Sequence, residues 1–97
     1  MRLHVTDILW KERVATKLAD KHGVSTSEVE DALRSRPLVR KIAKGRVRGE
    51  HVYAALAQTG SGRYLIVFFI LKKHGIIMPI SARDMDASER RYYARER

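Results

Sequence analysis

Two arginines, Arg63 and Arg83, are the residues of this sequence whose positions best suit phosphate chemistry. Arg63 opens an apolar run after a Gly-rich turn at residues 59–62, and Arg83 closes the next apolar run. If these runs pair as antiparallel strands with symmetric turns, Gln58 lies opposite Arg63, and Arg83 lies opposite Leu65. We therefore expect Gln58, Arg63 and Arg83 to meet on one face at one end of a sheet. Because a guanidinium fork suits a phosphodiester, this cluster predicts a phosphate-binding site.

Positive charge is concentrated in the middle of the chain. Residues 38–82 carry eight basic residues and one acidic residue, whereas the segments on either side each have a net charge of +1. Such a field attracts phosphates, although an acidic lipid surface or an acidic protein would satisfy the same electrostatics. We favour nucleic acid as the partner of the basic run Arg40, Lys41, Lys44, Arg46 and Arg48, and we expect its phosphates to contact Lys41, Lys44, Arg46 and Arg48.

Length and composition exclude several classes of protein. The 97 residues suffice for one domain, which we expect to span residues 1–97. Without cysteine there is no disulfide or Cys-based zinc site, and the four histidines are scattered, so we expect no metal and no cofactor. The longest apolar run, residues 64–71, is too short to span a membrane, and no signal peptide is recognisable. These features predict a cytoplasmic protein without a membrane partner.

The elements that must position these residues can be read from periodicity and capping. Helices are predicted over residues 10–21 and about 26–34, the second with a capping box between Ser25 and Glu28. Strands are predicted at 51–58, 63–71 and 76–82, while residues 38–49 form a short edge hairpin or a loop. Asp86 and Glu89 cap a last helix. The pattern is that of an α+β fold with an antiparallel sheet.

An ordered set of short motifs resembles the BrnT family of toxins, within the RelE/ParE superfamily of type II toxin–antitoxin systems. The resemblance implies a small antiparallel sheet with two N-terminal helices and one C-terminal helix. It also implies an RNA-cleaving toxin that blocks translation. Its partner would be a cognate antitoxin of the BrnA type, whose ribbon-helix-helix domain makes the only contact with DNA. The motifs are Trp10, Lys21-His22-Gly23-Val24-Ser25, Gly49-Glu50, Thr59, Gly62-Arg63, Ile80-Ser81-Ala82-Arg83, Glu89-Arg90-Arg91 and Tyr93.

The same resemblance marks Arg63, Arg83 and Tyr93 as candidate catalytic residues. The arginines suit a phosphorane, and Tyr93, if it packs over the same end of the sheet, could stack on a base or donate a proton. The chain departs from the family pattern in several places. Gln58 stands where a basic residue is common, His51 replaces an arginine, and Ala87-Ser88 replace basic positions.

The expected activity is a metal-independent endoribonuclease. No residue near the predicted cluster suits a general base, so we expect slow cleavage or cleavage assisted by the ribosome. Two alternatives remain open at this point. One is a ParE-like gyrase inhibitor that cleaves nothing, and the other is a non-catalytic RNA-binding or degenerate toxin, which the lost basic positions favour.

Overall fold

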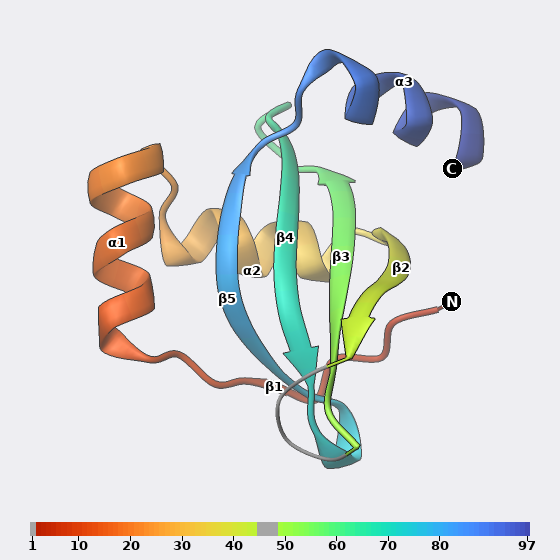
Figure 1. Cartoon of the computed structure of the whole chain (residues 1–97). Helices are drawn as coiled ribbons and strands as arrows, with labels where there is room; N and C mark the ends of the chain where they lie inside the picture. The colour runs from red at the N-terminus through yellow and green to blue at the C-terminus, as the bar shows by residue number, and fades with distance from the viewer. Residues whose placement is uncertain (1, 45–48) are drawn as a thin grey trace.

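The chain folds into a five-stranded sheet with helices on both faces (Figure 1). The computed structural model describes residues 2–44 and 49–97, without the side chain of Lys44. The strand order is β1-β5-β4-β3-β2, and every pair is antiparallel except β1 with β5. The predicted α+β class, with a mostly antiparallel sheet, is confirmed. The elements are β1 (Asp7–Ile8), α1 (Glu12–His22), α2 (Thr26–Arg34), β2 (Leu38–Lys44), β3 (His51–Gln58), β4 (Tyr64–Leu71), the 3-10 turn η1 (Lys73–Gly75), β5 (Ile76–Asp84) and α3 (Ala87–Glu96).

Alternate residues of the central strands supply two separate apolar layers. Leu65, Val67 and Phe69 of β4 are fully buried against the helices α1 and α2. Ile66 of β4 instead packs with Tyr93 of α3 on the other face. The sheet is therefore covered on both sides, as the doubly apolar sequence of β4 predicts. In Figure 1, α2 crosses behind the sheet and α3 lies at its upper end.

Local capping signals set one end of each of the three helices. Gly23 ends α1 with a φ of +59°, in the left-handed region that glycine tolerates. The Ser25 hydroxyl accepts from the Glu28 amide at 3.1 Å, and the Glu28 carboxylate accepts from the Ser25 amide at 3.0 Å. Asp86 and Glu89 form the same reciprocal pair at the start of α3 (2.8 and 2.9 Å). The two predicted capping boxes are confirmed.

The turn between β3 and β4 differs from the predicted one by one residue. Gln58 lies opposite Tyr64, so the predicted Gln58–Arg63 pair is wrong. The Thr59 amide donates to the Arg63 carbonyl at 2.8 Å, which leaves a loop of three residues rather than four. Gly62 permits this loop because it adopts a φ of +95°.

A bulge in β5 causes a second shift of one residue. The pairing runs in the predicted register from Leu71–Ile77 to Phe69–Pro79, but Phe68 then pairs with Ser81 and skips Ile80. Pro79 has no amide for the ladder, so an irregularity beside it is expected. Arg83 consequently lies opposite Ile66 and not opposite Leu65.

Candidate functional site

The bulge in β5 places Arg83 on the face opposite Arg63, and the shifted β3–β4 turn does the same for Gln58. Arg63 precedes Tyr64, so it lies on the same face as Leu65, which α1 and α2 cover. Arg83 lies opposite Ile66 on the face that α3 covers. The expectation that Gln58, Arg63 and Arg83 meet on one face is therefore wrong. The physical reason is that a slip of one residue moves a strand's side chains to the opposite face.

Arg63 is bound from all sides by groups of the protein. Nε and Nη2 donate to the Asp84 carboxylate at 2.7 and 3.1 Å, and Nη1 donates to Glu28 at 3.0 Å. The remaining N–H groups reach the carbonyls of Gly23 (2.9 Å) and His22 (3.3 Å). All five guanidinium donors are therefore used, and they join the end of α1 and the start of α2 to the end of β5.

The carboxylates around Arg63 are held in their ionised form. The amide of Ser25 and the guanidinium of Arg63, in that order, lower the pKa of Glu28. Hydrogen bonds from Arg63 lower the pKa of Asp84. Hydrogen bonds to Asp84 and Glu28 in turn raise the pKa of Arg63, so the guanidinium stays charged. This arrangement is typical of a structural clamp.

Arg83 is only partly engaged. Nη1 and Nη2 form a bidentate pair with Glu89 at 2.7 and 2.9 Å, and Nη1 also lies 3.3 Å from the Asp84 carbonyl. Nε and one Nη2 proton donate to no other described residue. The hydrogen bond from Arg83 lowers the pKa of Glu89 in spite of partial burial, so both groups are charged at neutral pH.

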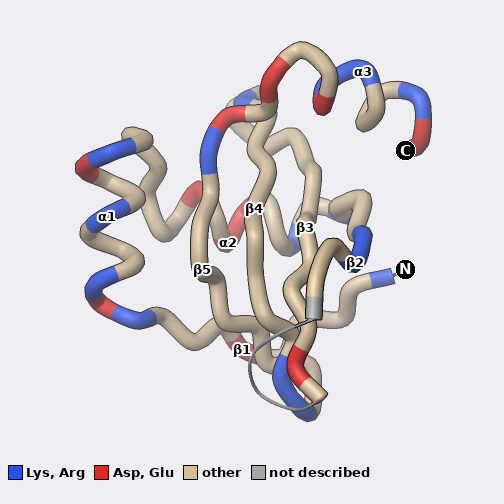
Figure 2. Tube along the Cα trace, viewed as in Figure 1, with Lys and Arg blue, Asp and Glu red and all other residues tan. Residues whose placement is uncertain are grey.

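A recess of about 490 Å³ lies between the sheet and α3, and we call it the α3 basin. Arginines reach it from three elements, β2, β5 and α3. Figure 2 marks the basic positions on these elements in blue. Among the described residues that line the basin, Glu89 is the only carboxylate. The lining consists of Arg40, Ile42, Ala54, Leu56, Ile66, Phe68, Arg83, Ser88, Glu89, Arg91, Tyr92 and Arg95.

Two aromatic rings lie beneath these arginines. The guanidinium carbon of Arg40 is 4.9 Å from the centre of the Tyr92 ring, and that of Arg95 is 5.7 Å from it. Arg83 lies 5.7 Å from the centre of the Phe68 ring. The basin thus presents cations above flat aromatic surfaces, which together suit a phosphate and an unstacked base.

Sequence reasoning missed three members of this site, Arg91, Tyr92 and Arg95, and it included Arg40 in the basic run without assigning it to a face. A signal for the three helical residues was present, because residues 88, 91, 92 and 95 follow the i, i+3, i+4, i+7 spacing of one helix face. Arg40 could be assigned to the α3 face only from its register, since it lies opposite Ala54.

Tyr93 and Gln58 lie outside the basin. Tyr93 is 6% exposed and packs edge-on against Tyr64, with ring centres 6.2 Å apart. Gln58 is on the α3 face, but its side-chain amide donates to the Gly62 carbonyl at 3.3 Å. Both side chains are thus engaged in holding this end of the sheet.

The basic residues predicted in the middle of the chain are only partly described. Lys41 is exposed and lies opposite Tyr53, which packs against the α1–α2 core, so it belongs to the face away from the basin. Lys44 is the last residue of β2, with its side chain outside the description. Arg46 and Arg48 lie outside the described residues.

Two negative findings apply to residues 2–44 and 49–97. No group of three or more histidine, aspartate or glutamate side chains is arranged to hold a metal ion. No helix in this part of the chain is long and apolar enough to cross a membrane.

A family model matches most of this chain, and a solved structure shares its fold. The fold is similar to that of the Brucella abortus ribonuclease toxin BrnT, solved at 1.1 Å, with a TM-score of 0.57 and 17% sequence identity. The match covers 82% of this chain and 96% of the Brucella chain. No curated protein gives a significant match. The model of the family described as "Ribonuclease toxin, BrnT, of type II toxin-antitoxin system" matches residues 10–89. This chain therefore belongs to the BrnT family of ribonuclease toxins.

Proposed function

We propose that the α3 basin is where this toxin binds and cleaves RNA. The observation that carries the proposal is the gathering of Arg40, Arg83, Arg91 and Arg95 around two aromatic rings, with one carboxylate among the described lining residues. Arginines bind phosphodiesters in a fork, and aromatic rings stack on the bases of single-stranded RNA. The aromatic rings favour single-stranded RNA over a polyanion that has no bases to stack.

The chemistry we propose is attack of a ribose 2′-oxygen on the adjacent phosphorus. The bond to the 5′-oxygen breaks, and the products are a 2′,3′-cyclic phosphate and a 5′-hydroxyl. Arg83 stabilises the charge that develops on the phosphorane through the N–H groups that Glu89 leaves unused. Glu89 is ionised and adjacent to Arg83, so it is the candidate acceptor for the 2′-hydroxyl proton. Water protonates the leaving 5′-oxygen.

The other predicted residues act around this centre. We propose that Tyr93 and Arg63 position the elements, because Tyr93 anchors α3 and Arg63 is saturated by protein groups. Gln58, Lys41, Lys44, Arg46 and Arg48 are assigned to outer contacts with the RNA. Since Glu89 is a weak base, positioning of the RNA by the ribosome would raise the rate.

The test is cleavage of a defined single-stranded RNA in excess chelator, with detection of the cyclic phosphate. Arg83→Ala should lower the rate by about 10²- to 10³-fold, as removal of one oxyanion donor does in other enzymes. Arg83→Lys should recover little of the loss, because lysine cannot form the fork. Arg13→Ala, on the exposed side of α1, is the matched control and should cleave normally.

Four outcomes would contradict the proposal. Full cleavage and toxicity in Arg83→Ala would remove the basin from the mechanism. Salt-dependent RNA binding without any turnover would indicate a degenerate toxin. DNA damage with intact messenger RNA would indicate a gyrase inhibitor. Loss of activity in chelator, restored by a divalent cation, would contradict the metal-independent chemistry.

Family membership implies a cognate antitoxin. We propose that it is of the BrnA type, with a ribbon-helix-helix domain that makes the complex's DNA contacts, and that the toxin acts on cytoplasmic RNA. A placement of the toxin in the RelE/ParE superfamily accords with the α+β architecture. The adjacent reading frame tests the partner directly: it should encode a small ribbon-helix-helix protein, and any other kind of protein there would contradict this assignment.

A further inference from the structure

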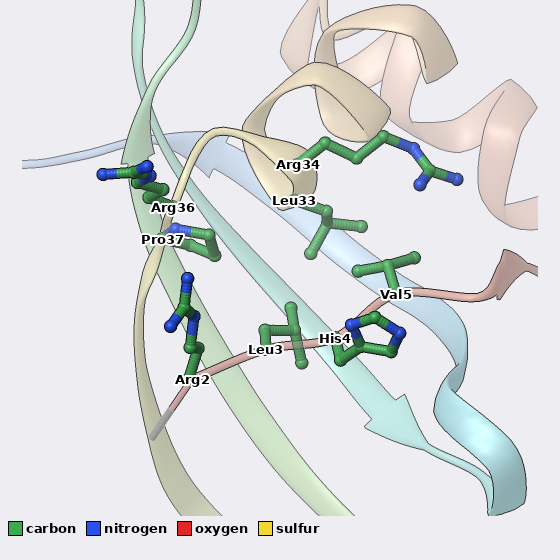
Figure 3. A pocket seen from close by; sticks show the side chains of 8 residues that line it. All are labelled: Arg2, Leu3, His4, Val5, Leu33, Arg34, Arg36 and Pro37. Atoms are coloured by element: carbon green, nitrogen blue, oxygen red, sulfur yellow. The ribbon is translucent and has the colours of Figure 1, made fainter.

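A second basic recess lies on the opposite side of the sheet, and we call it the N-terminal groove. It has a volume of about 720 Å³ and lies between the segment 2–5 and the link from α2 to β2. In Figure 3, Leu3, Val5 and Leu33 point toward one another across it. The residues around it are Arg2, Leu3, His4, Val5, Leu33, Arg34, Arg36 and Pro37.

The rim of the groove carries positive charge without compensation. Arg2, Arg34 and Arg36 form no ion pair or side-chain hydrogen bond with another described residue, in contrast to Arg63 and Arg83. None of the lining residues is acidic. Three unopposed guanidinium groups around one recess favour an occupant that carries carboxylates or phosphates.

The residues at the floor of the groove distinguish between RNA, which carries phosphates, and an acidic protein segment, which carries carboxylates. The floor is formed by the aliphatic residues Leu3, Val5, Leu33 and Pro37, and the lining contains no phenylalanine, tyrosine or tryptophan. The one aromatic ring in the lining is the imidazole of His4, an exposed residue. RNA-binding sites for single strands use aromatic platforms, as the α3 basin does with Phe68 and Tyr92. An aliphatic floor instead suits the side chains of a protein segment.

The backbone of residues 2–5 is available to pair with an extended protein segment. Its residues alternate between exposed (Arg2, His4) and half-buried (Leu3, Val5), which is the pattern of an extended strand. No backbone amide of Leu3, His4 or Val5 donates to another described residue, and regular pairing starts only with Thr6. An extended partner could therefore pair with this backbone while its side chains contact the floor.

The conformation of Arg36 supports a binding role. Its φ is +50°, in the left-handed region that residues other than glycine rarely adopt, and it directly precedes Pro37. Such local strain is often retained where it holds a side chain in a functional position. Here the conformation sets the guanidinium at the rim of the groove.

We infer that the N-terminal groove binds an extended segment of the cognate antitoxin in which acidic residues alternate with aliphatic ones. This inference rests on membership of the toxin–antitoxin family and not on the location of the nuclease site. The antitoxin would thus hold the toxin on the face opposite the α3 basin.

Hydrogen exchange on the toxin, alone and in complex with the antitoxin co-expressed from its own operon, tests the inference without mutation. The amides of residues 3–5 should exchange rapidly in the free toxin and at least tenfold more slowly in the complex. Unchanged exchange at these amides would overturn it.

Charge reversal provides the second arm. Arg34→Glu combined with Arg36→Glu should weaken antitoxin binding by 10- to 100-fold and leave RNA cleavage by the free toxin unchanged. Arg13→Glu combined with Lys17→Glu changes the net charge equally on exposed positions of α1 and should alter binding less than twofold. If the reversed variant fails to fold, the neutral pair Arg34→Gln and Arg36→Gln replaces it.

Two results of this arm would contradict the inference. An equal loss of antitoxin binding in the control pair would show that only net charge matters. Weaker RNA binding with unchanged antitoxin binding would assign the groove to RNA instead. Failure of Arg83→Ala to lower cleavage would overturn the nuclease site while leaving this inference intact.

Discussion

At the scale of residues, Arg63 and Arg83 look alike in the sequence but differ in their hydrogen-bond partners. Arg63 directly precedes one apolar strand and Arg83 lies near the end of the next, and both were candidates for phosphate binding. All guanidinium N–H groups of Arg63 donate to oxygen atoms of the protein, whereas Arg83 has N–H groups that can donate to a ligand. The residue type predicts that an arginine binds oxygen anions. The register of the strand decides whether these anions are carboxylates of the protein or phosphates of a ligand.

Arg63→Ala should reduce stability rather than remove a catalytic group. The substitution leaves Glu28, Asp84 and two carbonyls without their donor, and we expect the free energy of unfolding to fall by about 2 kcal/mol. Urea denaturation followed by circular dichroism measures this, with Arg13→Ala as the control. Cleavage per folded molecule should stay within a few-fold of the wild type. An unchanged urea midpoint together with lost cleavage would return Arg63 to the active site.

Acid should destabilise the toxin through the same carboxylates. Glu28 and Glu89 have pKa values below their ordinary 4.5 in the folded chain, because hydrogen bonds favour the ionised form. Their contribution to stability is thus present above pH 4.5 and is lost as the pH falls through the folded pKa values. Urea midpoints measured from pH 6 to pH 3 should decline mainly below pH 4.5, and Glu28→Gln should flatten that decline. A midpoint that is constant over this range would contradict the assignment.

At the scale of elements, what the sequence predicts well is local. Helix ends followed from Gly23 and from two capping boxes, since each signal involves residues within four positions of each other. The strands β3, β4 and β5 also followed from apolar runs, whereas β2 lies in the basic segment for which a hairpin and a loop were both open. The register of the strands could not be predicted, because a three-residue loop and a bulge at Ile80 each shift it by one residue. The residue types at these places permit such a loop and such a bulge but do not require them. The parallel pair of β1 was missed because its two residues carry no periodicity.

The two capping boxes offer a matched test of the α3 basin. Asp86→Ala and Ser25→Ala each remove the N-cap acceptor of one helix and should each lower stability by about 1 kcal/mol. Only Asp86→Ala loosens the helix that carries Glu89 and Tyr92, so only this variant should lower the rate of RNA cleavage beyond its effect on folding. Denaturation curves and cleavage rates at a temperature where both variants are folded provide the comparison. Equal cleavage by the two variants would separate α3 from the active site.

At the scale of the whole molecule, the sheet separates two basic surfaces with different floors. The α3 basin combines arginines with aromatic rings, and the N-terminal groove combines arginines with aliphatic side chains. The net charge of +9 draws polyanions to the chain in general, so selectivity between RNA and protein must come from the floors. An antitoxin segment in the groove can therefore coexist with an open basin, and neutralisation then requires a further part of the antitoxin or a change in α3.

The salt dependence of RNA binding should report how many phosphates the basin holds. If its four arginines each contact one phosphate, the logarithm of the association constant should fall with the logarithm of salt concentration with a slope of about −2.8. Replacing both Arg91 and Arg95 by alanine should make the slope shallower by ~1.4, because two contacts are lost. Fluorescence anisotropy of a labelled single-stranded RNA between low and moderate salt measures both slopes. The matched pair Arg13→Ala and Lys17→Ala removes equal charge from α1 and should leave the slope unchanged. An equal change of the slope in both double variants would mean that RNA binding depends on net charge alone. That result would contradict the assignment of the basin as the RNA-binding site.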